Sequence, residues 1–334
     1  MNVAGWLELS KTSHILHLRD QNLDSLPELP PNLEQLWCEY NRLTDLPLLP
    51  SSLKILFCDS NHLSSLPTLP ESLEMLNCDE NAIGVLPTLP LSLENLLCSG
   101  NQLVGLPDLP LGLSLLRCRD NQLTSLPSLP PMLGELECEI NQLTYLPDLP
   151  DSLYKLDCDR NQLTVLPALP TSLIDLQCSG NHLTLLPALP DGLETLTCGW
   201  NQLTTLPLLP SSLRDVNLQG NPLVFPLGAI YSDYEDDDDV QQFISSVNAY
   251  VLEEERKAKL RSNARNLRSL RLVSKNGFGN MPEDVRLHIG RILSGKTGKN
   301  VQTQIRSLEQ EHNRRTRRNT RKKRKGGRST VLVA

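Results

Sequence analysis

Residues 51–70 read SSLKILFCDSNHLSSLPTLP and are one copy of a unit that recurs every 20 residues. An asparagine follows each cysteine of the array by three residues. Two weaker copies, with leucine in place of the cysteine, flank the nine copies that carry one, which makes eleven units over residues 14–230. The nine cysteines are Cys38, Cys58, Cys78, Cys98, Cys118, Cys138, Cys158, Cys178 and Cys198.

Each column of the repeat predicts a local structure. The short Leu-x-Cys segment is expected to be a β-strand, and successive strands stack in parallel about 4.8 Å apart. Because side chains alternate along a strand, the leucine and cysteine columns face inward. The asparagine amide satisfies buried backbone groups where the chain leaves the strand. The Leu-Pro-x-Leu-Pro segment, as in residues 46–50, is expected to be an extended, polyproline-like return, because proline fixes φ and lacks a donor.

A 20-residue unit of the form Leu-x-x-Leu-x-Cys-x-x-Asn-x-Leu is typical of the leucine-rich repeat. With its Leu-Pro-rich return, the array resembles the bacterial effector class of these repeats, as in the YopM and IpaH families. The resemblance implies an effector delivered into the cytoplasm of a eukaryotic host, and we expect the basic tail at residues 311–334 to steer it to the nucleus. We expect a leucine-rich-repeat solenoid, with parallel β-strands and extended Pro-rich returns, followed by a small α-helical C-terminal region and a disordered basic tail.

The cysteine positions also bear on enzymatic activity. IpaH-type proteins end in a ubiquitin-ligase domain with a nucleophilic cysteine, whereas no cysteine follows Cys198 here. A thioester-forming ligase needs a thiolate, so we expect no catalytic residues and no cofactor. The sequence has no Cys-x-x-Cys motif, and we expect no metal site. Reduced structural thiols favour an intracellular, reducing location, and the sequence has no apolar run long enough to span a membrane.

The outward strand positions form three columns that hold ten acids and three bases over residues 35–219. Aromatic side chains beside charged ones are typical of protein interfaces, although repeat surfaces also vary without function. We predict that a protein with a basic patch binds this concave, acidic face. The predicted contact residues are Trp37, Tyr40, Phe57, Arg117, Arg119, Glu137, Glu139, Asp157, Asp159 and Trp200.

The net charge of −7 conceals two halves of opposite sign. Residues 1–230 carry 9 bases and 26 acids, and residues 231–334 carry 23 bases and 13 acids. We expect a short N-terminal cap at 1–13, an acidic linker at 231–239 and a helical region at 240–310. A helical pattern of apolar residues is expected to cover the open end of the last repeat. These residues are Val240, Phe243, Ile244, Val247 and Val251.

Residues 281–310 carry two alternative signals. The segment MPEDVRLHIGRIL resembles the start of an F-box, which implies an adaptor that recruits a ubiquitin-ligase scaffold. Gly290 and the run Gly295-Lys296-Thr297 match a phosphate-binding loop. The four spacer residues continue an apolar helix face instead of forming the required loop, so nucleotide binding is the weaker alternative.

Residues 311–334 end the chain in a basic tail with ten bases and no acid between Arg314 and Arg328. Such a run is typical of a nuclear-import signal, read by an import receptor, or of an anion-binding segment. Nucleic acid is a secondary partner, bound through phosphates alone, because no aromatic residues are interleaved. A solvated tail is the third reading. The predicted residues are Arg314, Arg315, Arg317, Arg318, Arg321, Lys322, Lys323, Arg324 and Lys325.

Overall fold

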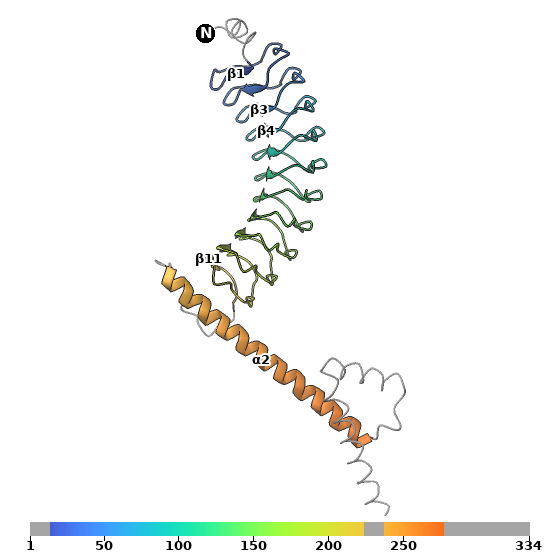
Figure 1. The fold of residues 1–334 in the computed structure, drawn as a ribbon, viewed down its shortest axis with the longest axis vertical. Helices are drawn as coiled ribbons and strands as arrows, with labels where there is room; N and C mark the ends of the chain where they lie inside the picture. Colours follow the sequence, from blue (N-terminus) through green and yellow to red (C-terminus); the bar gives the residue numbers. More distant parts are fainter. Residues whose placement is uncertain (1–13, 224–236, 277–334) are drawn as a thin grey trace, which may run out of the picture. The chain divides into compact units, whose positions relative to one another are not determined.

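The computed structural model describes residues 14–223 and 237–276. Eleven three-residue strands form one parallel sheet in which each strand pairs with the next along the chain, and residue i lies beside residue i+20. Figure 1 shows the strands following one another along one side of the stack. They are β1 (Ile15–His17), β2 (Gln35–Trp37), β3 (Ile55–Phe57), β4 (Met75–Asn77), β5 (Asn95–Leu97), β6 (Leu115–Arg117), β7 (Glu135–Glu137), β8 (Lys155–Asp157), β9 (Asp175–Gln177), β10 (Thr195–Thr197) and β11 (Asp215–Asn217).

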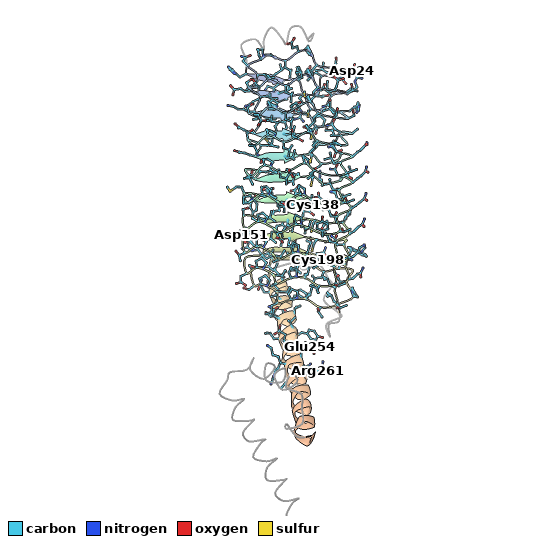
Figure 2. All side chains as sticks on the ribbon, turned by 90° about the vertical axis from the view of Figure 1, so that its right-hand side faces the viewer. Asp24, Cys138, Asp151, Cys198, Glu254 and Arg261 are labelled. Carbon is cyan, nitrogen blue, oxygen red and sulfur yellow. The ribbon has the colours of Figure 1, made fainter. Side chains whose placement is uncertain are left out.

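The core consists of the columns that the repeat pattern predicts to face inward. The central leucine of the strand and the cysteine two residues later are fully buried, as at Leu136 and Cys138. The strand is the central leucine with one residue on each side, so it ends one residue before the cysteine. Figure 2 shows Cys138 and Cys198 within the stack, whereas Asp24 and Asp151 lie at its outer margin. The solenoid prediction is therefore confirmed.

The asparagine column binds each unit to the one before it. Nδ2 of Asn141 donates to the carbonyl oxygens of Cys118 (3.0 Å), Cys138 (3.1 Å) and Glu139 (3.3 Å), and its Oδ1 accepts from the N–H of Leu123 (3.0 Å). Cys118 and Leu123 belong to the preceding unit. The same four bonds recur at the asparagines from Asn61 to Asn201. The predicted role of the asparagine amide is confirmed, and it extends across the unit boundary.

The Leu-Pro returns contain neither helix nor strand, as the prolines predict. Their first leucine packs into the core, as Leu46 and Leu146 show. A turn follows each return, and Leu53 N–H donates to the carbonyl of Pro50 at 3.1 Å. In many units a serine then joins neighbouring turns, as Ser52 does by donating to the carbonyl of Leu33 at 2.7 Å. Short polar bonds of this kind hold the side of the stack that has no sheet.

Helix α2 (Asp237–Asn276) covers the end of the last repeat with its first turns. The apolar pattern predicted to do this is confirmed, because Val240, Phe243, Ile244 and Val247 are buried in the same core as the repeat leucines. Val251 packs against that core in part. A helix that buries an i, i+3, i+4, i+7 stripe against an apolar end replaces the neighbour that an interior repeat would have.

Two polar side chains of α2 satisfy the backbone of the last repeat. Interior serines such as Ser52 donate to the carbonyls 21 and 19 residues before them. At the end of the array the corresponding carbonyls, of Ser211 and Leu213, accept from Nε2 of Gln241 at 3.2 and 3.0 Å. Asn248 exchanges two bonds of 2.8 Å with the N–H and the carbonyl of Leu209. Gln241 therefore makes the two hydrogen bonds that a serine would make if a twelfth unit followed.

The chain divides into two compact units, Met1–Leu252 and Glu253–Ala334. The first holds the repeats and the capping turns of α2. The second begins with a charged stretch of α2, where Glu254 pairs with Lys257 at 2.9 Å and Glu255 with Lys259 at 3.8 Å. The predictions for residues 1–13, 281–310 and 311–334 lie outside the described residues.

Candidate functional site

The strand face is defined as the side chains of the first and third residues of each strand, together with the residue two positions further on. On β7 these are Glu135, Glu137 and Glu139. They alternate with the buried Leu136 and Cys138, so they lie on the solvent side of the sheet. With strands about 4.8 Å apart, one side chain from each unit lines up with those of its neighbours.

A network of ion pairs occupies the strand face at β6–β8. Nε of Arg117 lies 3.1 Å from Oε2 of Glu137, and its Nη2 lies 3.6 Å from Oε2 of Glu135. Nζ of Lys155 donates to Oε1 of Glu137 at 2.6 Å, and this bond raises the pKa of Lys155. The hydroxyl of Tyr154 donates to Oε1 of Glu135. The side chains of Arg117 and Lys155 thus neutralise the charges of Glu135 and Glu137, without any partner protein.

Gly134 makes room for the tyrosine of this network. A Cβ atom at position 134 would lie 2.6 Å from Cε1 of Tyr154. The aromatic ring therefore lies over the backbone of the preceding unit and reaches the carboxylate of Glu135. Each of these side chains is fixed by a partner in the adjacent unit.

Three further carboxylates, Glu139, Asp157 and Asp159, form the acidic cluster. Nη1 of Arg119 lies 3.8 Å from Oε1 of Glu139, whose Oε2 is buried without a hydrogen-bond partner. The N–H of Asp159 donates to Oδ1 of Asp157 at 3.1 Å, and the N–H of Ser179 donates to Oδ1 of Asp159 at 2.5 Å. Burial raises the pKa of Asp157 to about 7, and it also raises the pKa values of Glu139 and Asp159. A cation brought to the cluster favours the charged carboxylates.

Aromatic side chains gather on the first three strands. The rings of Trp37 and Phe57 stack with their centroids 4.3 Å apart and their planes at 3°, and the ring of His17 lies 5.6 Å from that of Trp37. At the edge of this group the guanidinium of Arg19 lies 4.8 Å from the centroid of the Tyr40 ring. The rings of His17, Trp37 and Phe57 thus form a continuous surface across β1–β3.

The residue before each asparagine has a left-handed backbone. Its φ lies between 51° and 74° in all eleven units, from Asp20, which precedes Gln21 in the first unit, to Gly220; Tyr40 is at 57°, Ile140 at 56° and Trp200 at 54°. Glycine accepts this conformation freely, whereas a β-branched residue is strained in it. Tyr40, Ile140 and Trp200 are 51%, 41% and 65% exposed, so their side chains are open to contact by a partner. The left-handed conformation itself belongs to the turn, because serine, glutamate, aspartate and arginine adopt it in other units.

The predicted contact residues therefore lie in three places. Trp37, Phe57 and Tyr40 belong to the aromatic group, and Trp200 lies near the other end of the array. The six charged residues lie together on β6–β8 and just after each strand: Arg117, Arg119, Glu137, Glu139, Asp157 and Asp159. Their roles in binding stay predictions.

Four residues of this surface were not among the predicted contact residues, namely Glu135, Tyr154, Lys155 and Ile140, although Glu135 and Lys155 belong to the outward columns. The 20-residue period was sufficient to find Glu135 and Lys155, because it places positions 117, 135, 137 and 155 on adjacent strands. Tyr154 lies outside these columns, directly before β8. Nothing in the sequence marks Ile140, since its position also holds serine, glutamate and glycine in other units.

Residues 14–223 and 237–276 are the part of the chain that the structure describes. No three His, Cys, Asp or Glu side chains in these ranges gather as a metal site requires. No helix in the same part of the chain is long and apolar enough to cross a membrane. Lys296 and the F-box-like segment lie outside it, so both alternatives stay predictions.

Comparison with solved structures gives several similar repeat proteins. YopM from Yersinia enterocolitica WA-314 is 39% identical over 61% of this chain and 50% of that chain, with a TM-score of 0.56. The functional domain of InlJ from Listeria monocytogenes, described as including a cysteine ladder, is 28% identical over 64% of this chain and 55% of that one, with a TM-score of 0.55. A complex of Latrophilin 3, Unc5D and the leucine-rich repeats of FLRT2 matches at 24% identity and a TM-score of 0.50, over 63% of this chain and 74% of that one.

No protein-family model and no curated protein matches the chain. The chain spans half of the length of the YopM chain that it matches. The part that the structure describes consists of the eleven units and helix α2. Its repeat geometry and these similarities identify the chain as a leucine-rich repeat protein that resembles the bacterial effector class of YopM.

Proposed function

We propose that this chain is a non-enzymatic effector that binds a host protein carrying a basic patch on its strand face. The leucine-rich repeat is an interaction scaffold, and FLRT2 is solved in a complex with other proteins. The observation that carries the proposal is the acidic cluster of Glu139, Asp157 and Asp159, held beside an internally balanced network. The resemblance to YopM supports delivery into a host cell.

The electrostatics of the cluster favour a cationic partner. Arg117 and Lys155 neutralise Glu135 and Glu137, so the charge that β6–β8 leave for a partner is that of the cluster, opposed by Arg119 at 3.8 Å. Its carboxylates are partly desolvated before binding, so part of the cost of removing them from water is already met by folding. Backbone N–H groups hold two of them in place. A guanidinium or ammonium group would then gain a strong, oriented contact.

The cysteines support a non-enzymatic role. Burial raises the pKa of every thiol in the ladder, that of Cys198 to about 12. A nucleophilic cysteine requires a thiolate near neutral pH, in a partly exposed and electropositive place. The described thiols have the opposite surroundings.

The proposal is tested by removing the charge of the cluster and comparing it with the same change elsewhere. The variant Glu139→Gln/Asp157→Asn/Asp159→Asn changes the net charge by +3. The control Asp108→Asn/Asp148→Asn/Asp191→Asn makes the same change at exposed positions away from the strand face. Wild type and control are expected to retain one basic host protein from a eukaryotic lysate, and the cluster variant to lose it. Equal retention by all three chains would refute the proposal.

We propose that the basic run from Arg314 to Arg328 acts as an import signal, on the strength of its ten bases without an acid. The chain ending at residue 312, tagged and imaged in host cells, is expected to lose nuclear enrichment. A tail with every basic residue changed to glutamine serves as the length-matched control and should behave like the truncation. Persistent nuclear enrichment of both would refute the role.

A further inference from the structure

The strand face changes character between β6 and β7. Of the twelve first and third strand positions on β1–β6, seven hold large apolar side chains, whereas none of the ten positions on β7–β11 does. The first column contains Ile15, Ile55, Met75 and Leu115. The second contains Trp37, Phe57 and Leu97. We call these seven residues the apolar band; it lies on the blue-to-green part of the sheet in Figure 1.

The apolar band is partly open to solvent. Ile15 is 40% exposed, and the other six side chains are half-buried. The stack of Trp37 on Phe57 fixes two of the largest side chains before any partner arrives. Exposed apolar patches rimmed by polar residues mark interaction sites. The core of the repeat does not need these residues, because the polar side chains on β7–β11 occupy the same positions in the same fold.

Acidic residues border the apolar band on both sides. The positions before the strands carry Glu34, Glu74 and Glu94, and the positions after them carry Glu39, Asp59 and Asp79. Lys54 lies 3.3 Å from Glu34, and Arg19 lies 3.6 Å from Glu39. Arg119 is the third base at these positions, so six acids against three bases leave the two rims with a net charge of −3 when His14 is neutral. Oε2 of Glu39 is buried without a hydrogen-bond partner.

The spacing of the strands determines which secondary structure keeps the side chains of a bound peptide aligned with the apolar band. Strands lie about 4.8 Å apart, and one turn of an α-helix rises about 5.4 Å. An extended chain returns a side chain to the same face only every ~6.7 Å. Over the five intervals from β1 to β6, the mismatch grows to about 3 Å for a helix and about 10 Å for a strand. A helix therefore keeps its apolar side chains in step with the apolar band.

We propose that the apolar band binds an amphipathic helix of a partner protein, with a narrow apolar face and lysine or arginine along both flanks. The five intervals span about 24 Å, which corresponds to about 16 helical residues. The apolar face of the helix covers the band, and its flanking cations reach the two acidic rims. The inference rests on the strand face being the binding surface, as proposed above, but it places a second contact region away from the acidic cluster.

The test uses a synthetic peptide of leucine and lysine, about 18 residues long, in a helical pattern. A peptide of the same composition with strictly alternating leucine and lysine is the extended control. Binding is measured by fluorescence anisotropy, and helix formation by circular dichroism. The helical peptide is expected to bind and to gain helicity. The alternating peptide is expected to bind at least tenfold more weakly. Equal binding of both peptides would overturn the proposal of a helix.

Two sets of variants locate the binding site. Met75→Ser/Leu97→Ser is expected to weaken binding about tenfold, and the exposed pair Leu91→Ser/Leu111→Ser, away from the strand face, to leave it unchanged. Since the first pair also lies near the core, Glu74→Lys/Glu94→Lys tests the rim at exposed positions without disturbing packing. That variant should bind the lysine peptide several-fold more weakly and a glutamate version of it more tightly. If neither Met75→Ser/Leu97→Ser nor Glu74→Lys/Glu94→Lys changes the affinity for the peptides in the expected direction, the proposal is overturned.

The variant of the acidic cluster separates the two proposals. Glu139→Gln/Asp157→Asn/Asp159→Asn is expected to keep the affinity for the helical peptide within twofold, because the cluster lies beyond β6. If this variant loses the host protein and keeps the peptide, both proposals stand. If it loses the peptide, the assignment of the helix to β1–β6 is wrong, whatever happens to the host protein.

Discussion

Replacing the buried Asn141 with alanine should destabilise the chain far more than truncating a polar side chain on the surface does. The side chain makes four hydrogen bonds of 3.0–3.3 Å, and three of the groups it reaches are backbone atoms of buried residues. A typical bond contributes about 1 kcal/mol net, and a buried group left unsatisfied costs about 1–3 kcal/mol. The expected loss of unfolding free energy is therefore about 3–5 kcal/mol.

The array supplies two matched comparisons for this variant. Gln21 occupies the same column in the first unit, where its Nε2 donates only to the exposed carbonyls of Arg19 and Asp20. Gln21→Ala is expected to cost less than about 0.5 kcal/mol. Asn141→Asp keeps the acceptor but places a carboxylate beside three carbonyl oxygens, so it should be at least as harmful as alanine.

The assay is urea unfolding at 25 °C, followed by circular dichroism and by tryptophan fluorescence. Trp37 and Trp200 lie near opposite ends of the array, so a transition that differs between probes would reveal partial unfolding. If Asn141→Ala and Gln21→Ala lower the unfolding free energy by amounts within about 1 kcal/mol of each other, the asparagine bridges do not hold the units together, and the reasoning is refuted.

Three more outcomes follow from the structure. Ile140→Gly should stabilise the chain by about 0.5–1 kcal/mol by relieving a left-handed β-branched residue, and Gly180→Ala should destabilise it by a similar amount; urea midpoints shifted in the same direction would contradict this. All nine cysteines should be silent to a thiol reagent until the chain is unfolded, because they are buried and protonated; any rapid reaction of the native chain would argue otherwise. The raised pKa of Asp157 means that the unfolded chain loses this proton before the folded one, so stability falls as pH rises from about 4 to about 7; Asp157→Asn should flatten that fall, whereas the exposed Asp151→Asn should not.

The period of the repeat made most of the fold predictable. A strict spacing of 20 residues fixes the register of every strand, and buried leucine and cysteine columns follow from side-chain alternation. The packing face of α2 was also evident, since Val240, Phe243, Ile244 and Val247 follow helical spacing. Gln241 and Asn248 were not foreseen, because their roles depend on which carbonyls the last repeat leaves open.

The candidate site was less predictable, because charge and conformation depend on neighbours. Glu137 reads as a free acid in the sequence, yet Arg117 and Lys155 balance it from the strands on either side. The left-handed backbone at Ile140 is set by the turn that leads to Asn141, and the identity of the residue gives no sign of it. Composition alone therefore overstates the charge available on β6–β8 and misses the strain beside it.

The asparagine bridges have a direction that bears on how the protein is made. Every one reaches from its own unit toward the amino end, so a unit receives its last backbone partners only from the unit that follows. A ribosome releases the units in that same order. Each newly synthesised asparagine thus completes the backbone hydrogen bonds of the unit before it. Helix α2 follows the repeats, and its Gln241 and Asn248 do the same for the last unit. Assembly can follow synthesis step by step, without waiting for a distant part of the chain.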